Sequence, residues 1–200
     1  MNVGHRYKGG PWLFRSIQYA FEPGKIYALT GPSGSGKSTL LSILAGLEKP
    51  SEGSLAIERI ERRSWVFQNP FGAPRRSAID HVSLPLLARG LSVRDAHAQA
   101  DDLLRDLGLG SVRARAFREL SGGEAQRLML ARGIAADPDL LLVDEPTAQL
   151  DRRSAATVDA VLGALAVPHR IVIIATHDPN TRDACTDQFD LGEHLDCSDR

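Results

Sequence analysis

Runs of consecutive apolar residues recur along the chain and predict its main strands. Residues 26–29, 140–143 and 171–175 show no alternation of apolar and polar positions, and the last run is rich in β-branched side chains. Such runs are typical of strands that are buried on both faces. Because helical patterns separate them, we expect an α/β fold with a mostly parallel sheet.

The stretch between residues 70 and 133 has hardly any strand signal. Ser92 followed by Asp95 predicts the start of a helix, and Gly108 predicts its end. We therefore expect an α-helical subdomain over residues 70–133, inserted into a core formed by residues 1–69 and 134–200 of a single domain. One face of this helix is apolar, at Ala96, Ala100, Leu103, Leu104 and Leu107.

The region between Gly46 and Phe67 is short and rich in turn residues. Pro50-Ser51-Glu52-Gly53 predicts a turn into a short hairpin.

Composition and charge exclude several classes of protein. The 200 residues include 24 Lys and Arg against 25 Asp and Glu, so bulk charge cannot hold the chain on nucleic acid, and we expect no nucleic-acid partner. The apolar runs are too short to cross a bilayer, and the first ten residues lack the apolar core of a signal peptide. Cys185 and Cys197 lack metal-ligand spacing, which favours a reducing, cytoplasmic setting.

A glycine-rich stretch carries the strongest chemical signal. It follows an apolar strand, opens a predicted helix and matches the P-loop pattern G-x-x-x-x-G-K-[ST]. Such a loop points backbone N–H groups at phosphate oxygens, Lys37 is expected to reach the β- and γ-phosphates, and the Ser38 hydroxyl is expected to bind Mg²⁺. The alternative is an ordinary strand-to-helix turn. The predicted nucleotide-binding residues are Gly31, Pro32, Ser33, Gly34, Ser35, Gly36, Lys37, Ser38 and Thr39.

A second apolar strand ends in two acids, Asp144 and Glu145. Carboxylates at the carboxyl end of a parallel strand lie where open α/β sheets bind ligands. We expect Asp144 to hold Mg²⁺ beside Ser38 and Glu145 to accept a proton from the attacking water. The alternative is a pair of solvated acids before the turn at Pro146.

Leu120-Ser121-Gly122-Gly123-Glu124 has both a structural and a chemical interpretation. Ser121 and Glu124 form a capping box for a helix through Gly133. Two glycines in a first turn are poor helix formers, however, and they suit a helix start that an anion approaches closely.

These motifs, in this order, resemble those of the ATP-binding cassette (ABC) ATPases, whose signature sequence is LSGGE. The resemblance extends over nearly the whole chain. It implies a RecA-like P-loop NTPase core with a mostly parallel sheet, the inserted helical subdomain and an antiparallel β subdomain. The short stretch from Gly53 to Trp65 implies that this β subdomain is reduced.

The resemblance also implies roles for further residues. Gln68 resembles the glutamine that contacts Mg²⁺ and the attacking water, and His177 resembles the switch histidine that contacts the γ-phosphate. Asp151 resembles the aspartate at the dimer interface. Tyr7 stands where the family places an aromatic ring on adenine, with ordinary packing as its alternative. Ser121, Gly122, Gly123 and Glu124 would contact the nucleotide of a second subunit.

The resemblance further implies partners and a location. Family members hydrolyse Mg²⁺-bound ATP in a head-to-tail dimer, on the inner face of the membrane, and drive a separate permease. His81-Val82-Ser83 followed by Pro85-Leu86-Leu87 resembles exporters of the lipoprotein-release and macrolide-efflux type.

Two alternatives come from other classes. An ATPase that regulates or scaffolds a membrane complex, of the cell-division type, shares these motifs. ABC ATPases that act on DNA have a long coiled-coil or zinc insert between the P-loop and the signature. Here Ser121 follows Ser38 by only 83 positions, and this segment contains no heptads, which disfavours such an ATPase.

Overall fold

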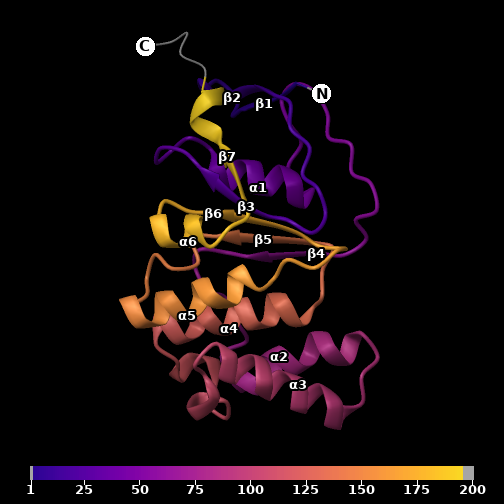
Figure 1. Cartoon of the computed structure of the whole chain (residues 1–200), viewed down its shortest axis with the longest axis vertical. Helices are drawn as coiled ribbons and strands as arrows, with labels where there is room; N and C mark the ends of the chain where they lie inside the picture. Colours follow the sequence, from indigo (N-terminus) through magenta and orange to yellow (C-terminus); the bar gives the residue numbers. More distant parts are fainter. Residues whose placement is uncertain (1, 196–200) are drawn as a thin grey trace.

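A computed structural model describes residues 2–195 and shows a layered α/β molecule (Figure 1). A parallel five-stranded sheet in the order β4-β5-β6-β3-β7 lies at its centre. The expected α/β class with a mostly parallel sheet is confirmed. Its strands are β3 (Ile26–Thr30), β4 (Arg63–Val66), β5 (Leu140–Asp144), β6 (Ile171–Ala175) and β7 (Asp187–Asp190).

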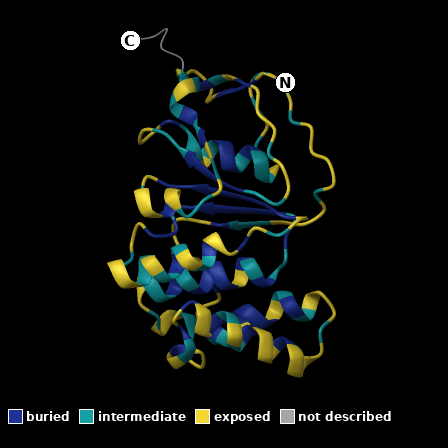
Figure 2. Cartoon of the chain, in the orientation of Figure 1, coloured by how far each residue is buried: buried dark blue, intermediate teal, exposed yellow. Residues whose placement is uncertain are grey.

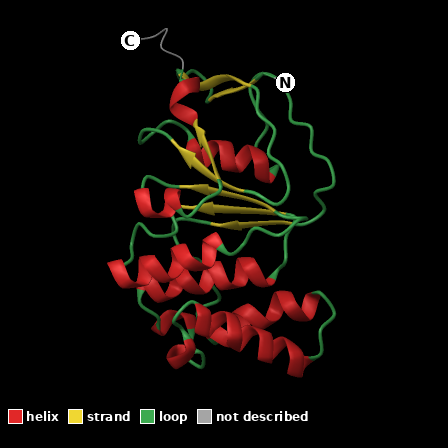
Figure 3. Ribbon diagram, viewed as in Figure 1, coloured by secondary structure: helices red, strands yellow, loops and turns green. Residues whose placement is uncertain are grey.

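Helices cover both faces of this sheet, as Figure 3 shows. On one face lies α1 (Lys37–Ala45), with the antiparallel pair β1 (Val3–Arg6) and β2 (Trp12–Ile17) beyond it. On the other face lie α4 (Gly122–Ala135) and α5 (Arg152–Gly163), with α2 (Ala78–Ala88) and α3 (Val93–Asp106) outside them. A short helix, α6 (Pro179–Asp183), follows β6.

The central strands are buried on both faces because their apolar residues serve two cores (Figure 2). Successive side chains of a strand point to opposite faces. Ile171 and Ile173 accordingly join a cluster with α1, whereas Val172 and Ile174 join the cluster that contains α4 and α5. This double burial explains why the three central strands could be predicted from unbroken apolar runs.

The helical region also agrees with its local signals. Ser92 begins α3 by accepting a hydrogen bond from the Asp95 amide at 3.2 Å. Gly108, with φ 68°, follows the end of the helix. Two short 3₁₀ helices, Gly110–Val112 and Phe117–Glu119, connect α3 to α4, which lies against both the helical region and strands β4 and β5.

The prediction of a hairpin between Gly46 and Phe67 is wrong. Glu52 instead forms an isolated antiparallel bridge with Gly4, so the turn at residues 50–53 lies beside β1. The next strand, β4, pairs in parallel with β5. The expected reduced antiparallel subdomain is present as the β1–β2 pair, while β4 and β7 lacked an unbroken apolar run and were not predicted.

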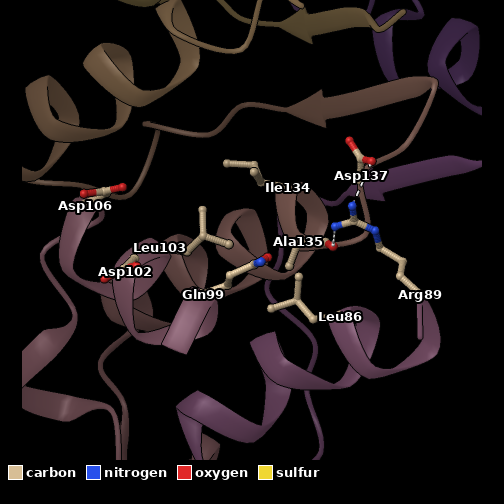
Figure 4. A pocket seen from close by; sticks show the side chains of 9 residues that line it. All are labelled: Leu86, Arg89, Gln99, Asp102, Leu103, Asp106, Ile134, Ala135 and Asp137. Carbon is tan, nitrogen blue, oxygen red and sulfur yellow. Dashed lines mark hydrogen bonds and ion pairs between the residues drawn. The ribbon is translucent and has the colours of Figure 1, made fainter. Parts of the chain in front are cut away.

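A cluster of charges lies at the amino end of the sheet, around Asp137 in the loop before β5. Asp137 accepts hydrogen bonds from Arg170 at 2.7 Å and from Arg89 of α2 at 3.0 Å. Arg89 also donates to the Ala135 carbonyl at 3.1 Å, and Figure 4 shows the two contacts of Arg89 at the edge of a cavity of about 290 Å³. The Asp137 carboxylate therefore joins the helical layer to the sheet.

Within residues 2–195, no helix combines the length and apolarity needed to span a membrane. Cys185 is a free cysteine, and Cys197 lies outside the described residues. Burial raises the pKa of the Cys185 thiol to about 12, which keeps it protonated at neutral pH.

Candidate active site

Three neighbouring strands bring the predicted site residues to one edge of the sheet. The glycine-rich loop follows β3, Asp144 ends β5, and His177 comes two residues after β6. Because β6 lies between β5 and β3 and all three are parallel, their carboxyl ends meet at this edge. This is the edge at which open α/β sheets bind ligands.

The backbone of the loop requires glycine. Gly31, Gly34 and Gly36 have φ angles of 139°, 79° and 93°, which residues with a Cβ rarely adopt. A Cβ at Gly31 would also lie 3.2 Å from the backbone nitrogen of Gly192, and one at Gly36 would lie 3.0 Å from the Phe14 ring. The loop therefore curls tightly against segments from both ends of the chain.

Two features of the loop suit an anion. No side chain caps the start of α1, so its first N–H groups and the positive end of the helix dipole are free for a ligand. Lys37 Nζ bridges the loop by donating to the carbonyls of Gly31 at 2.9 Å and Pro32 at 3.1 Å. Ser35 Oγ is buried without a hydrogen-bond partner inside the same loop.

Asp144 is buried beside the start of α1, with 6% of its surface exposed. Burial raises the pKa of the Asp144 carboxyl, and the charge on Glu145 raises it further. The hydrogen bond with Ser38 and the charge on Lys37 lower this pKa, but it stays above its ordinary value. A buried carboxylate next to a hydroxyl provides the oxygen ligands that Mg²⁺ prefers. Residues 2–195 contain no cluster of three or more His, Cys, Asp or Glu residues placed to hold a metal ion. The donor set thus fits an ion that takes its other ligands from phosphate and water.

Glu145 and His177 face each other across the ends of β5 and β6. His177 Nδ1 lies 2.8 Å from Glu145 Oε2, close enough for an ion pair when the imidazole is protonated. Oε2 is buried and makes no hydrogen bond of ordinary geometry, so the contact lies off the ring N–H direction. The Glu145 side chain is 11% exposed, whereas that of His177 is 71% exposed. The pair thus combines a sheltered carboxylate with an imidazole open to a ligand.

The start of α4 has the predicted capping box. Ser121 Oγ accepts from the Glu124 amide at 3.3 Å, and Glu124 Oε2 accepts from the Ser121 amide at 2.8 Å. The bond from Ser121 lowers the pKa of Glu124 and keeps it ionised. A Cβ at Gly123 would lie 3.0 Å from Leu150 Cδ2, so the start of α4 packs closely against the loop before α5 and a larger residue there would displace the Leu150 side chain.

The remaining predicted residues lie at separate places around this edge. Asp151 caps α5 by accepting from the Arg153 and Ser154 amides, each at 3.0 Å. Tyr7 is 53% exposed, and its hydroxyl lies 3.3 Å from Thr39 Oγ1 on α1. Gln68 is exposed two residues after β4. The structure therefore places Tyr7 beside α1, the helix that follows the glycine-rich loop. Asp151 lies at the start of α5, and Gln68 lies in the loop after β4.

The family is decided by comparison with known proteins. Residues 14–148 match the family model described as ABC transporter. The chain belongs to the ABC transporter family. It is an ABC ATPase, and the expected fold of this family is confirmed.

Individual ABC proteins resemble the chain over most of its length. It is 35% identical to the lipoprotein-releasing system ATP-binding protein LolD of Alcanivorax borkumensis, over 92% of this chain and 87% of that one. It is 37% identical to the macrolide export ATP-binding/permease protein MacB 1/2 of Paracoccus denitrificans, over 88% of this chain and 29% of that longer protein. A dimeric, post-hydrolysis structure of the ATP-binding cassette MJ0796 bound to ADP and Pi superimposes with a TM-score of 0.82 at 28% identity, covering 96% and 93% of the two chains.

Sequence reasoning missed some residues that shape this ABC ATPase site. Phe14 and Gly192 pack against the P-loop from opposite ends of the chain, and Thr147 and Thr181 form a buried hydrogen-bonded pair in the segments that follow Glu145 and His177. No local pattern marks these residues, because each acts through a partner distant in sequence.

Proposed function

We propose that this ABC ATPase is the ATP-hydrolysing subunit of an exporter and drives a separate membrane permease. Relatives whose names describe lipoprotein release, macrolide export and pyoverdine export support this assignment. In this proposal the chain is cytoplasmic and peripheral, held on the inner face of the membrane by the permease.

The P-loop residues bind the phosphates of ATP. Backbone N–H groups of residues 34–38 and the Lys37 ammonium surround the β- and γ-phosphates, and Tyr7 stacks on adenine. Lys37 Nζ donates to two carbonyls of the loop, and it exchanges these contacts for phosphate oxygens when ATP binds. The Ser38 hydroxyl, Asp144 and Gln68 hold Mg²⁺, which neutralises negative charge on the phosphates when bound.

Glu145 acts as the general base. A water molecule attacks the γ-phosphorus as the bond to the β-phosphate oxygen breaks, and Glu145 takes a proton from that water, leaving ADP and inorganic phosphate. His177 contacts the γ-phosphate and holds Glu145 in place through the 2.8 Å contact. The sheltered position of Glu145 suits this role because the surrounding protein excludes competing water.

One observation carries the proposal of a head-to-tail dimer. The P-loop and α1 lie on one face of the sheet, whereas α4, with its exposed Ser121 and Gly122 start, lies on the other face. The N–H groups of Gly122 and Gly123, which take no part in the capping box, are thus available to the γ-phosphate of an ATP bound to a second copy. ATP then bridges two subunits, and hydrolysis removes the bridge.

The permease docks beside Gln68 and over residues 70–89. A groove of about 290 Å³ lies in this region between the loop after β4, α2 and α4. Phe71 is 84% exposed and Leu84 44% exposed along it, and Arg76 and Arg132 line it as well. An exposed apolar surface with basic margins is typical of a protein-binding site.

The dimer proposal is tested by Ser121→Arg, which places a bulky side chain where the second subunit closes. The monomer should still bind ATP, whereas ATP-dependent dimerisation should be lost and turnover should fall about 100-fold through loss of the donors in trans. Light scattering with and without ATP and a phosphate-release assay measure these effects.

Ser92→Arg is the matched control, because Ser92 caps α3 in the same way with an exposed side chain. It should cost similar stability and leave dimerisation intact. Dimerisation that survives Ser121→Arg contradicts the arrangement. Reconstitution with the permease then separates transport, in which substrate moves on ATP addition, from a regulatory ATPase, in which none moves.

A further inference from the structure

Three polar side chains, those of Thr147, Thr181 and Asp159, are joined by hydrogen bonds in the segments that follow Glu145 and His177. Thr147 Oγ1 is 3.0 Å from Thr181 Oγ1, and Thr181 Oγ1 is 2.7 Å from Asp159 Oδ1. Thr147 and Thr181 are 5% and 0% exposed, so neither hydroxyl relies on solvent. Buried polar groups of this kind hold their surroundings in one arrangement when all of them are paired.

The hydrogen bonds have one direction when Asp159 is ionised. A threonine hydroxyl has a single hydrogen, and Thr181 donates it to the Asp159 carboxylate. Thr147 must therefore donate to the Thr181 oxygen. Burial raises the pKa of Asp159, and the Thr181 bond opposes that shift.

These hydrogen bonds join the two segments that present Glu145 and His177 to helix α5. Thr147 lies two residues after Glu145, and Thr181 lies four residues after His177, in α6. Asp159 belongs to α5, whose first turn is capped by Asp151. Two side-chain contacts thus link the segments that follow β5 and β6, one between Glu145 and His177 and one between the two threonines.

The backbone at Glu145 is strained, and the Thr147–Thr181 bond helps to hold it. Glu145 has a φ of 46°, a left-handed conformation that a long side chain adopts only when its surroundings enforce it. One restraint is the bond from the Glu145 amide to the Ala175 carbonyl at 2.9 Å. The Thr147–Thr181 bond is a second restraint, two residues further on.

We propose that Thr181 is a positioning residue for hydrolysis, which sets the geometry of His177 against Glu145 by binding Thr147 and Asp159 together. This inference rests on the proposed roles of Glu145 and His177. Thr181 does not touch ATP, so its removal should affect turnover and leave nucleotide affinity unchanged.

Thr181→Val tests the proposal because it keeps the side-chain shape and removes the hydroxyl. In the full-length chain, kcat for ATP should fall about tenfold, since misplacement of catalytic groups is costly, while KM stays within about twofold. Thr181→Ser restores the hydroxyl and should recover most of kcat. Thr157→Val is the matched control, because Thr157 Oγ1 bonds only to the Arg153 carbonyl on the outer part of α5, and its kcat should be unchanged.

A double-mutant cycle separates positioning from a purely structural role. If Thr181 acts through His177, Thr181→Val should change the residual turnover of His177→Ala less than about twofold. An undiminished tenfold effect in that background overturns the proposal, as does a normal kcat in Thr181→Val or a failure of Thr181→Ser to recover activity. Absence of turnover in the wild-type chain would instead contradict the proposed function itself.

Discussion

Two acidic residues have positive φ angles, which residues with a Cβ seldom adopt. Glu145 and Asp137 both have a φ of 46°, at opposite ends of strand β5. Such a conformation costs on the order of 1–3 kcal/mol, so each residue needs compensating contacts. Glu145 has them around His177, and Asp137 has Arg89, Arg170, Arg62 and His169 within 4 Å. Burial tends to raise the pKa of Asp137, but the hydrogen bond from Arg170 and the charge on Arg89 lower it overall.

Asp137→Asn should destabilise the protein by about 2 kcal/mol at pH 7, because the buried Arg170 loses its charged partner. Asn tolerates a left-handed backbone, so the change tests the charge and not the conformation. The folded-state pKa is depressed, hence the contribution of Asp137 is fully present above the ordinary value of 3.8 and is lost as the pH falls through the lower folded value.

Urea denaturation at several pH values measures this effect. Asp102→Asn is the control, because its carboxylate is 68% exposed on α3, and it should change stability by less than about 0.5 kcal/mol. The account is contradicted if the difference in free energy of unfolding between the wild type and Asp137→Asn grows as the pH is lowered.

At the scale of elements, α4 connects the helical layer to the sheet by close contact. A Cβ at Gly133 would lie 2.8 Å from Val66 Cγ2 of β4, nearer than real contacts allow. Val66 is buried and belongs to a strand, so it has little room to move. The approach of α4 to β4 therefore depends on this glycine.

Gly133→Ala should destabilise the protein by about 1–2 kcal/mol. Overpacking costs about 1–3 kcal/mol and outweighs the gain of up to about 1 kcal/mol from replacing glycine inside a helix. Gly163→Ala, at the end of α5, is the control, because its nearest contact would be an ordinary 3.4 Å to the Ala184 carbonyl. That variant should be neutral or slightly more stable by thermal denaturation. Equal stability of the two variants would show that α4 and β4 are packed more loosely.

At the scale of the whole molecule, the sequence predicts the parts that are locally encoded. The loop from β3 to α1 requires glycines at fixed spacing, and the buried strands β5 and β6 require unbroken apolar runs, so both could be inferred from the residues alone. Strand β7 reads Asp187-Gln188-Phe189-Asp190 and becomes a strand only by pairing with β3. The bridge from Gly4 to Glu52 and the bond from Thr147 to Thr181 likewise depend on tertiary contacts that no local pattern reveals.

The central claim is that Glu145 activates water in an ATP-bridged dimer, and Glu145→Gln tests it most directly. Glutamine keeps the shape of the side chain but cannot accept the proton, so kcat should fall by about 10²–10⁴ while ATP binding persists. Light scattering with Mg²⁺ and ATP should then show a stable dimer, and this dimer should contain two ATP molecules. Adding Ser121→Arg should return this variant to a monomer. Rapid ATP turnover by Glu145→Gln, or a monomer at saturating ATP, would contradict the account.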